Sequence, residues 1–302
     1  MHAHLLGPHV VGQRVVVRRV VPGEIGPTGG PAFTDVLGIC TAWGPSVAVI
    51  ESASGPVEIP LGLIVSGKPV PPRPSVRMRV GAREAELHAL PLWPDVERVR
   101  LGEWQLRADL APVGRLLKRA NSCLAMGSPE VPFAEAEARV RDFYAAHDRR
   151  PLAQVEDGSD VEDAFLAAGW EPLPVGESSF LLASTARLRR TLPAAGNADG
   201  ARGVELSIDG PRVVATTADG AASGRAGVDG DWIGLHGVEV SPSHRLRGLA
   251  TLIVSALVGW GTEQGATTAW LHVETDNDPA LALYERLGFA EHHRCRYLTP
   301  PA

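Results

Sequence analysis

Two arginines and a glycine separate a β-branched run from a long apolar run in the segment EVSPSHRLRGLATLIVSALVGW, residues 239–260. The pattern predicts a strand, a tight turn and a helix that begins close to Gly248. The first amides of a helix have no partner inside it, and the helix dipole is positive at that end. Arg245 and Arg247 add positive charge at the same place. The segment therefore predicts a cradle for a phosphate or pyrophosphate.

A second group of residues follows the next predicted strand, 267–274. The order strand, turn, helix, strand and helix over residues 203–298 resembles the GNAT superfamily of acetyl-CoA-dependent N-acetyltransferases. The family signature Arg/Gln-x-x-Gly-x-Gly/Ala is matched by Arg245, Gly248 and Ala250. The family's second motif, Asn-x-x-Ala-x-x-Leu-Tyr followed by Gly-Phe, is matched by Asn277, Ala280, Leu283, Tyr284, Gly288 and Phe289.

The resemblance implies that the chain binds acetyl-CoA as a co-substrate and uses no metal. In the family, the amides of the turn hold the pyrophosphate, and Gly248 lets it approach without a Cβ in the way. The strand before the turn separates from the next strand, and its free backbone groups pair with the pantetheine arm. The residues expected to contact the cofactor are Val238, Glu239, Val240, Arg245, Leu246, Arg247, Gly248, Leu249, Ala250, Thr251, Asn277 and Tyr284.

Acetyl transfer to an amine needs a general acid for the departing thiolate, and the family places its acid at Tyr284. A phenol, with a pKa of about 10, holds its proton at neutral pH. The general base stays open between His236 and His272, with Glu239 as a third candidate and an ordered water as an alternative. Strand alternation predicts that His236 shares a face with the valines at 238 and 240 and that Glu239 points the other way. An ordinary histidine pKa of about 6.5 suits a base at neutral pH.

Residues 133–170 repeat, in outline, the helix, strand and helix of the C-terminal part. At one constant offset Phe165 corresponds to Tyr284, and Gly169 to Gly288, so that each second helix ends in a glycine followed by an aromatic residue. The repeat predicts two related lobes. Because the first lobe has Phe165 in place of the acid and no Arg-x-x-Gly-x-Ala turn, we expect that it neither binds coenzyme A nor catalyses.

Residues 10–66 consist of five short β-type runs separated by glycine and proline, and their pattern resembles an SH3-like barrel. The proline-rich segment 68–76 predicts an extended linker. The expected fold class is α+β: a tandem GNAT acyl-CoA N-acyltransferase fold with a degenerate first lobe, preceded by a small all-β SH3-like barrel. The expected domains are 1–72 for the barrel, 73–185 for the degenerate lobe and 186–302 for the catalytic lobe.

The composition restricts the partners and the compartment. The 302 residues contain 29 Lys and Arg against 35 Asp and Glu, a net charge of −6, which argues against nucleic acid and anionic lipid as partners. The three cysteines are too far apart for a disulfide framework or a metal site, so we expect a reducing, cytoplasmic environment. No segment offers 18 uninterrupted apolar residues for a membrane span. The oligomeric state stays open.

These features together predict an N-acetyltransferase that moves an acetyl group to a primary amine by direct attack, through a tetrahedral intermediate. The acceptor is a small molecule or the lysine or N-terminus of a protein, and the acidic balance favours a basic peptide or polyamine. The degenerate lobe is expected to cover one side of the acceptor site, and the segment 119–129 is either a loop at that site or ordinary packing. The alternative is a non-catalytic module that senses coenzyme A or binds a protein.

Overall fold

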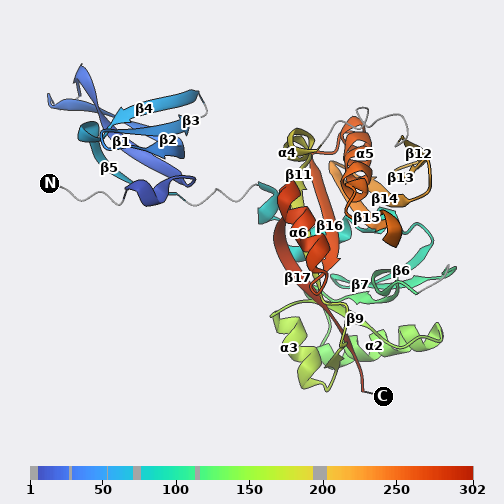
Figure 1. Cartoon of the computed structure of the whole chain (residues 1–302). Coiled ribbons are helices and arrows are strands. Elements are labelled where there is room, and N and C mark those ends of the chain that lie inside the picture. The colour runs from blue at the N-terminus through green and yellow to red at the C-terminus, as the bar shows by residue number, and fades with distance from the viewer. Residues whose placement is uncertain are drawn as a thin grey trace. The chain divides into compact units, whose positions relative to one another are not determined.

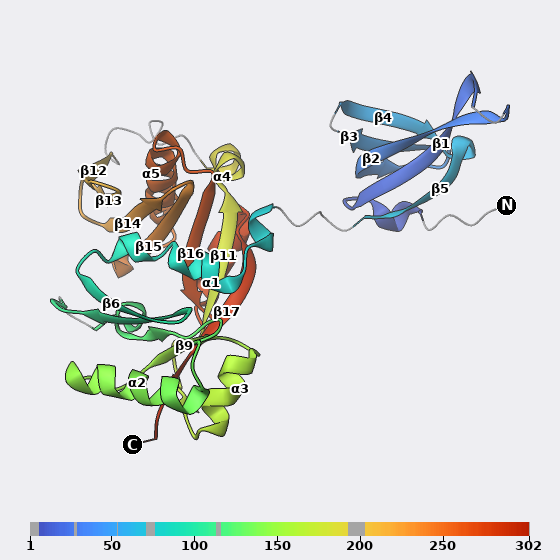
Figure 2. The same ribbon diagram turned by 180° about the vertical axis from the view of Figure 1, so that it is seen from behind.

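The computed structural model describes residues 6–26, 29–52, 54–70, 76–112, 116–192 and 203–301 (Figures 1 and 2). The chain divides into two compact units, Met1–Ser75 and Val76–Ala302. Most of the predicted linker and residues 193–202, within the predicted boundary between the lobes, lie outside the described residues. No helix in the described ranges is long and apolar enough to cross a membrane.

The N-terminal unit is a five-stranded antiparallel sheet in the order β4-β3-β2-β1-β5. Alternate residues of β1 point inward, so that Val15 and Val17 are buried beside Cys40, Ile50 and Ile59. A single 3-10 turn joins β4 to β5. The elements are η1 Pro8–Val10, β1 Arg14–Ile25, β2 Pro31–Trp43, β3 Val47–Ser52, β4 Gly55–Pro60, η2 Leu61–Leu63 and β5 Ile64–Pro69.

The C-terminal unit is built on one 12-stranded sheet, whose main path runs β12-β13-β14-β15-β16-β11-β17-β9-β8-β7-β6, with β10 paired to β17. The strands are β6 Val96–Leu101, β7 Trp104–Asp109, β8 Cys123–Leu124, β9 Ala153–Glu156, β10 Glu171–Pro172, β11 Ser178–Ser184, β12 Val204–Asp209, β13 Arg212–Thr217, β14 Ala222–Asp229, β15 Trp232–Val240, β16 Thr268–Glu274 and β17 Ala290–Thr299. The expected antiparallel meander is confirmed in β12 to β15.

Helices cover both faces of this sheet. The elements are η3 Val76–Arg79, α1 Ala82–Leu87, η4 Leu90–Leu92, η5 Lys118–Asn121, α2 Phe133–Ala146, α3 Asp160–Ala167, α4 Thr185–Thr191, η6 Pro242–His244, α5 Leu249–Glu263 and α6 Asp278–Leu287. Helices α5 and α6 pack on one face of strands β13 to β16 and form the largest apolar cluster. Helix α1 and η4 pack on the opposite face, against Phe180, Trp232 and Trp270. We call these the α5 face and the α1 face.

Strand β11 comes from the predicted first lobe but lies in the middle of the sheet. It pairs antiparallel with β16 from Ser178 to Ser184 on one side and with β17 on the other (Figure 2). Strand β17 in turn continues to β9 and β10 of the first lobe. The two halves of the unit are therefore joined by exchanged strands rather than by a surface contact.

The two helices that end in glycine have the same C-terminal geometry. Gly169 (φ 82°) and Gly288 (φ 96°) both adopt the left-handed conformation, as the sequence predicts. After them, the amide of Trp170 donates to the carbonyl of Phe165, and the amide of Phe289 donates to that of Tyr284, each at 3.0 Å. This local agreement supports the proposal that the lobes are related.

Candidate functional site

The turn after β15 leaves a row of main-chain amides without partners. Leu246 (φ 60°) and Gly248 (φ 77°) are left-handed, and α5 begins at Leu249 without a side-chain cap. Within the described part of the chain, the amides of residues 246–251 donate to no other protein group. Unpaired amides at the N-terminus of a helix 15 residues long form a site for an anion.

Basic and polar side chains lie around this turn. His244 and Arg247 line a small hollow together with Thr217, Asp219 and Leu249. The Arg245 side chain turns back and donates from Nε to the Val240 carbonyl at 3.5 Å. The hollow beside the amides therefore contains two groups, the imidazole of His244 and the guanidinium of Arg247, that can donate hydrogen bonds to a bound phosphate.

Strands β15 and β16 separate in front of the turn. They pair in parallel over Trp232–Leu235 and Thr268–Leu271, and they diverge beyond these residues. Strand β15 stays paired to β14 as far as its end, so the backbone of residues 236–240 is open on the β16 side. His236 and His272 are the first residues past the last pair, one on each strand. We call this place the fork.

A β-bulge in β15 changes which side chains share a face. His236 pairs with Arg225 of β14 and Glu239 pairs with Ser223, so two residues of β15 oppose one residue of β14. The extra residue is accommodated at Gly237, which has φ 58°. A left-handed glycine is a typical first residue of such a bulge.

The bulge overturns two predictions that were based on strand alternation. Val238 and Val240 pack on the α5 face, whereas the ring of His236 lies on the α1 face, 6.3 Å from the ring of Trp93. The prediction that His236 shares a face with the two valines is therefore wrong. The alternation restarts after the bulge and places Glu239 on the face of His236, and its side chain is exposed.

Both fork histidines lie in an environment that disfavours their charged form. Burial lowers the pKa of His236 to about 4, and the charges of Arg225 and Arg119 act in the same direction. Burial also lowers the pKa of His272 to about 4, with a further contribution from Arg119 and an opposing one from Glu86. Both imidazoles are neutral at pH 7, but they are weaker bases than the ordinary value assumed from sequence.

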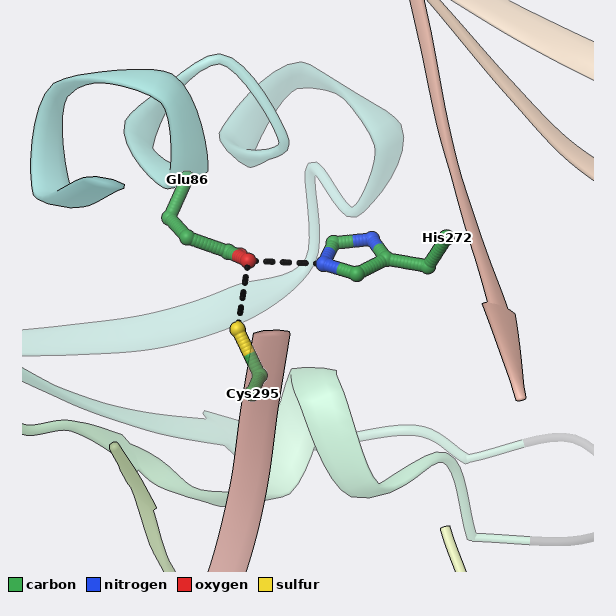
Figure 3. A group of neighbouring side chains, drawn as sticks. All are labelled: Glu86, His272 and Cys295. Atoms are coloured by element: carbon green, nitrogen blue, oxygen red, sulfur yellow. Dashed lines mark hydrogen bonds and ion pairs between the residues drawn. The ribbon is translucent and has the colours of Figure 1, made fainter. Parts of the chain in front are cut away.

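His272 belongs to a buried polar cluster around Glu86 of α1 (Figure 3). One carboxylate oxygen, Oε1, lies 2.7 Å from Nε2 of His272, 3.2 Å from Nε2 of His293 and 3.1 Å from Sγ of Cys295. The ligand-type atoms of Glu86, His272 and Cys295 all lie within 4.8 Å of one another. Oxygen, nitrogen and sulfur together are also a donor set that suits a transition metal.

Tyr284 is buried on α6, and its ring packs edge to face on Phe289 with 5.5 Å between centroids. Burial raises the pKa of its phenol to about 12, so it keeps its proton at neutral pH. Asn277 is the N-cap of α6, where its side chain accepts from the amide of Ala280 at 3.2 Å. The structure thus shows that Asn277 caps the start of α6. The sequence had predicted that this residue contacts the cofactor.

The segment 119–129 is mainly interior structure. Residues Ala120 to Met126 are buried and include strand β8, so for most of the segment the alternative of ordinary packing holds and not that of a loop over the acceptor site. Its first residue, Arg119, is different. Nε of Arg119 is buried without a hydrogen-bond partner in the described part of the chain, and its charge acts on both fork histidines.

Sequence reasoning missed Glu86, Arg119, His293 and Cys295. Glu86 is separated from its partners by 186 to 209 residues, and no local pattern marks it. The alternation of His293 and Cys295 on one strand is a weak signal, because both then face the same side. Their meeting with His272 depends on β11 lying between β16 and β17.

Comparisons with known proteins agree with the motifs. Residues 186–298 match the family described as "Probable histone acetyltransferase Rv0428c C-terminal". The probable histone acetyltransferase Rv0428c of Mycobacterium tuberculosis is 28% identical over 290 residues, 89% of either chain. Streptothricin acetyltransferase of Streptomyces lavendulae is 34% identical over 108 residues, 34% of this chain, which spans 57% of that relative's length.

Among solved structures, a GCN5-related N-acetyltransferase from Kribbella flavida superposes with a TM-score of 0.56 at 18% identity. The match covers 73% of this chain and 96% of that one. At this identity the similarity establishes the fold.

Proposed function

We propose that this chain is an N-acetyltransferase of the GNAT type, and that it transfers the acetyl group of acetyl-CoA to a primary amine by direct attack, through a tetrahedral intermediate. The observation that carries the proposal is the row of unpaired amides at residues 246–251 beside the open edge of β15. The amides bind the pyrophosphate, and the open edge binds the pantetheine arm by strand-like hydrogen bonds. The thioester then lies at the fork.

The chemistry is divided between the two faces of the sheet. Tyr284, on the α5 face, gives its proton to the coenzyme A sulfur as the intermediate collapses. His236 or His272, on the α1 face, takes a proton from the attacking nitrogen. Both histidines are neutral at pH 7, which is the form that a base requires. The amine therefore approaches from the α1 face, opposite the helix that binds the cofactor.

The charges on the α1 face bear on the acceptor. Arg225 pairs with His236 across β14 and β15, and the charges of both Arg225 and Arg119 act on that histidine. An amine that also carries a carboxylate can pair with one of these guanidinium groups, while Glu239, which is exposed on the same face, can pair with the ammonium group. We therefore favour a small amino acid-like acceptor over the basic acceptor expected from the net charge.

The remaining parts of the chain have supporting roles in this proposal. The first lobe, with Phe165 in place of Tyr284, supplies α1 and Arg119 to the α1 face and carries out no transfer itself. The N-terminal unit has the strand order and the 3-10 turn before the last strand that suit an SH3-like barrel, and we propose that it is one. The protein acts in the cytoplasm.

Release of free thiol from acetyl-CoA tests the proposal, with a panel of amino acids, their decarboxylated amines, polyamines and lysine peptides. Substitution of the acid, Tyr284→Phe, is expected to lower kcat by about 100-fold or more. The same variant should bind coenzyme A as tightly as the parent in calorimetry. Binding without turnover of any amine would instead favour a coenzyme A sensor, and absence of binding would refute the cradle.

A further inference from the structure

We propose that Glu86 is a positioning residue that orients His272 as the general base. The proposal rests on the proposed function. The short contact between Oε1 of Glu86 and Nε2 of His272, 2.7 Å, places the ring hydrogen on Nε2. The lone pair is then on Nδ1, which makes no hydrogen bond within the described part of the chain. The basic nitrogen then belongs to the residue immediately beyond the last pair of the fork.

The surroundings of Glu86 keep it ionised although it is buried. Its side chain has 0% exposure, and a lone carboxylate there would be costly. Contacts with His272 and His293 offset the desolvation and hold the pKa of Glu86 well below its usual value. The thiol of Cys295 donates to the same oxygen at 3.1 Å. Three contacts on one oxygen, from His272, His293 and Cys295, hold the direction of the carboxylate.

A chain of contacts fixes His293 in turn. Nε2 of His292 donates to the carbonyl of Val80 at 2.9 Å, so in the neutral ring Nδ1 of His292 is an acceptor. Nδ1 of His293, 2.7 Å away, then carries the donating hydrogen. Its other nitrogen, Nε2, lies 3.2 Å from Oε1 of Glu86. His293 thus contacts the same carboxylate oxygen as His272, and this contact helps to hold the carboxylate that orients His272.

The ligand-type atoms of Glu86, His272 and Cys295 could also bind a metal ion, which is the alternative interpretation of this cluster. Metal ligands surround a common centre about 2.0 to 2.3 Å from each of them. Here the oxygen of Glu86 is itself the common point, and the contacts of 2.7 and 3.1 Å from it have the lengths of hydrogen bonds. The geometry therefore points to protons between these groups. Metal analysis of the purified protein is included in the test.

The experiment compares Glu86→Gln with a matched control, Glu97→Gln. Glu97 also contacts a histidine, His147, at 3.1 Å, but lies on β6 at the far edge of the sheet. We expect Glu86→Gln to lower kcat by about 10- to 100-fold, because the neutral amide no longer stabilises the imidazolium. The KM for acetyl-CoA and the Kd for coenzyme A should stay the same. The control should leave kcat unchanged.

Two further measurements separate positioning from a structural role. In a His272→Gln background, Glu86→Gln should cause no further loss of kcat, since its effect acts through the ring. Nitrogen-15 NMR of the wild-type protein should show His272 with its proton on Nε2, a readout that needs neither turnover nor a folded variant. If wild-type enzyme shows no turnover but the tautomer is as stated, the proposed function fails and the orientation of the ring stands.

Three results would overturn the inference. One is full kcat in Glu86→Gln while the wild type is active. Another is additive loss in the double variant. The third is either a proton on Nδ1 of His272 or a stoichiometric metal ion whose removal by a chelator changes the NMR signals of His272.

Discussion

The indole ring of Trp270 occupies the place where a side chain on Gly234 would project. The two residues are partners in the parallel pairing of β15 and β16, and a Cβ on Gly234 would overlap the six-membered ring of the indole. The ring is buried on the α1 face, so it has little room to move. We expect Gly234→Ala to destabilise the protein by about 1 to 3 kcal/mol through overpacking, as measured by urea unfolding.

Gly259 is the matched control for this substitution. It lies within α5, and a Cβ there meets no atom within 4 Å. Gly259→Ala should be neutral or stabilise by up to about 1 kcal/mol, because alanine favours a helix. Equal losses in the two variants would contradict the packing explanation.

A side chain at Gly248 should weaken coenzyme A binding in addition to lowering the stability of the protein. Its φ of 77° disfavours any side chain, and Gly210, in the turn between β12 and β13, has a comparable φ of 56°. At both positions an added Cβ would meet no atom within 4 Å among the described residues. We expect Gly248→Ala and Gly210→Ala each to cost about 1 to 2 kcal/mol of stability.

Calorimetry with coenzyme A distinguishes these two glycines. A methyl group on residue 248 comes between the pyrophosphate and the free amides, so affinity should fall about tenfold or more, a loss of about 1.4 kcal/mol. Gly210→Ala should bind as the parent does. An unchanged Kd in Gly248→Ala would place the pyrophosphate elsewhere.

Stability should fall as the pH is lowered from 7 to 5. The pKa of His236 and His272 is about 4 in the folded protein, below the value of about 6.5 in an unfolded chain. Between these values the unfolded state binds more protons, so acid favours unfolding. At pH 5 each histidine should account for about 2 kcal/mol. Urea unfolding at both pH values measures the loss, and His236→Asn should reduce it. An equal loss in the variant would contradict the assigned shift.

Removal of the charge of Arg119 should raise the pKa of both fork histidines. In Arg119→Gln the acidic limb of the profile of kcat/KM should move to higher pH, because the imidazolium is no longer repelled. Arg100→Gln, an exposed arginine of β6, is the control and should leave the profile in place. A limb that stays fixed in Arg119→Gln would show that neither histidine is the base.

The parts that the sequence predicted well depend on short-range patterns. The turn at Gly248, the start of α5 and the left-handed end at Gly288 are set by residues a few positions apart, where glycine and helix periodicity act directly. The motif containing Tyr284 falls within one such stretch. The fold class followed from the order of these elements.

The parts that it did not predict depend on contacts between distant strands. One glycine, Gly237, added a residue to β15 and reversed the side chains that follow it, which alternation does not reveal. Glu86 and Arg119 lie near the fork but belong to the first lobe, and the residues next to them in the sequence do not indicate these contacts. Cys295 looked isolated along the chain, although its thiol lies 3.1 Å from a carboxylate oxygen.

The position of β11 limits how this protein can be divided or recombined. A fragment that starts after Ser184 would lack the strand between β16 and β17, and each of these would keep an unpaired edge inside a buried sheet. Such a fragment should aggregate unless the first half is supplied in trans. Gene fusions and truncations that treat the C-terminal half as a portable enzyme are therefore expected to fail, and co-expression of both halves offers a route to reassembly.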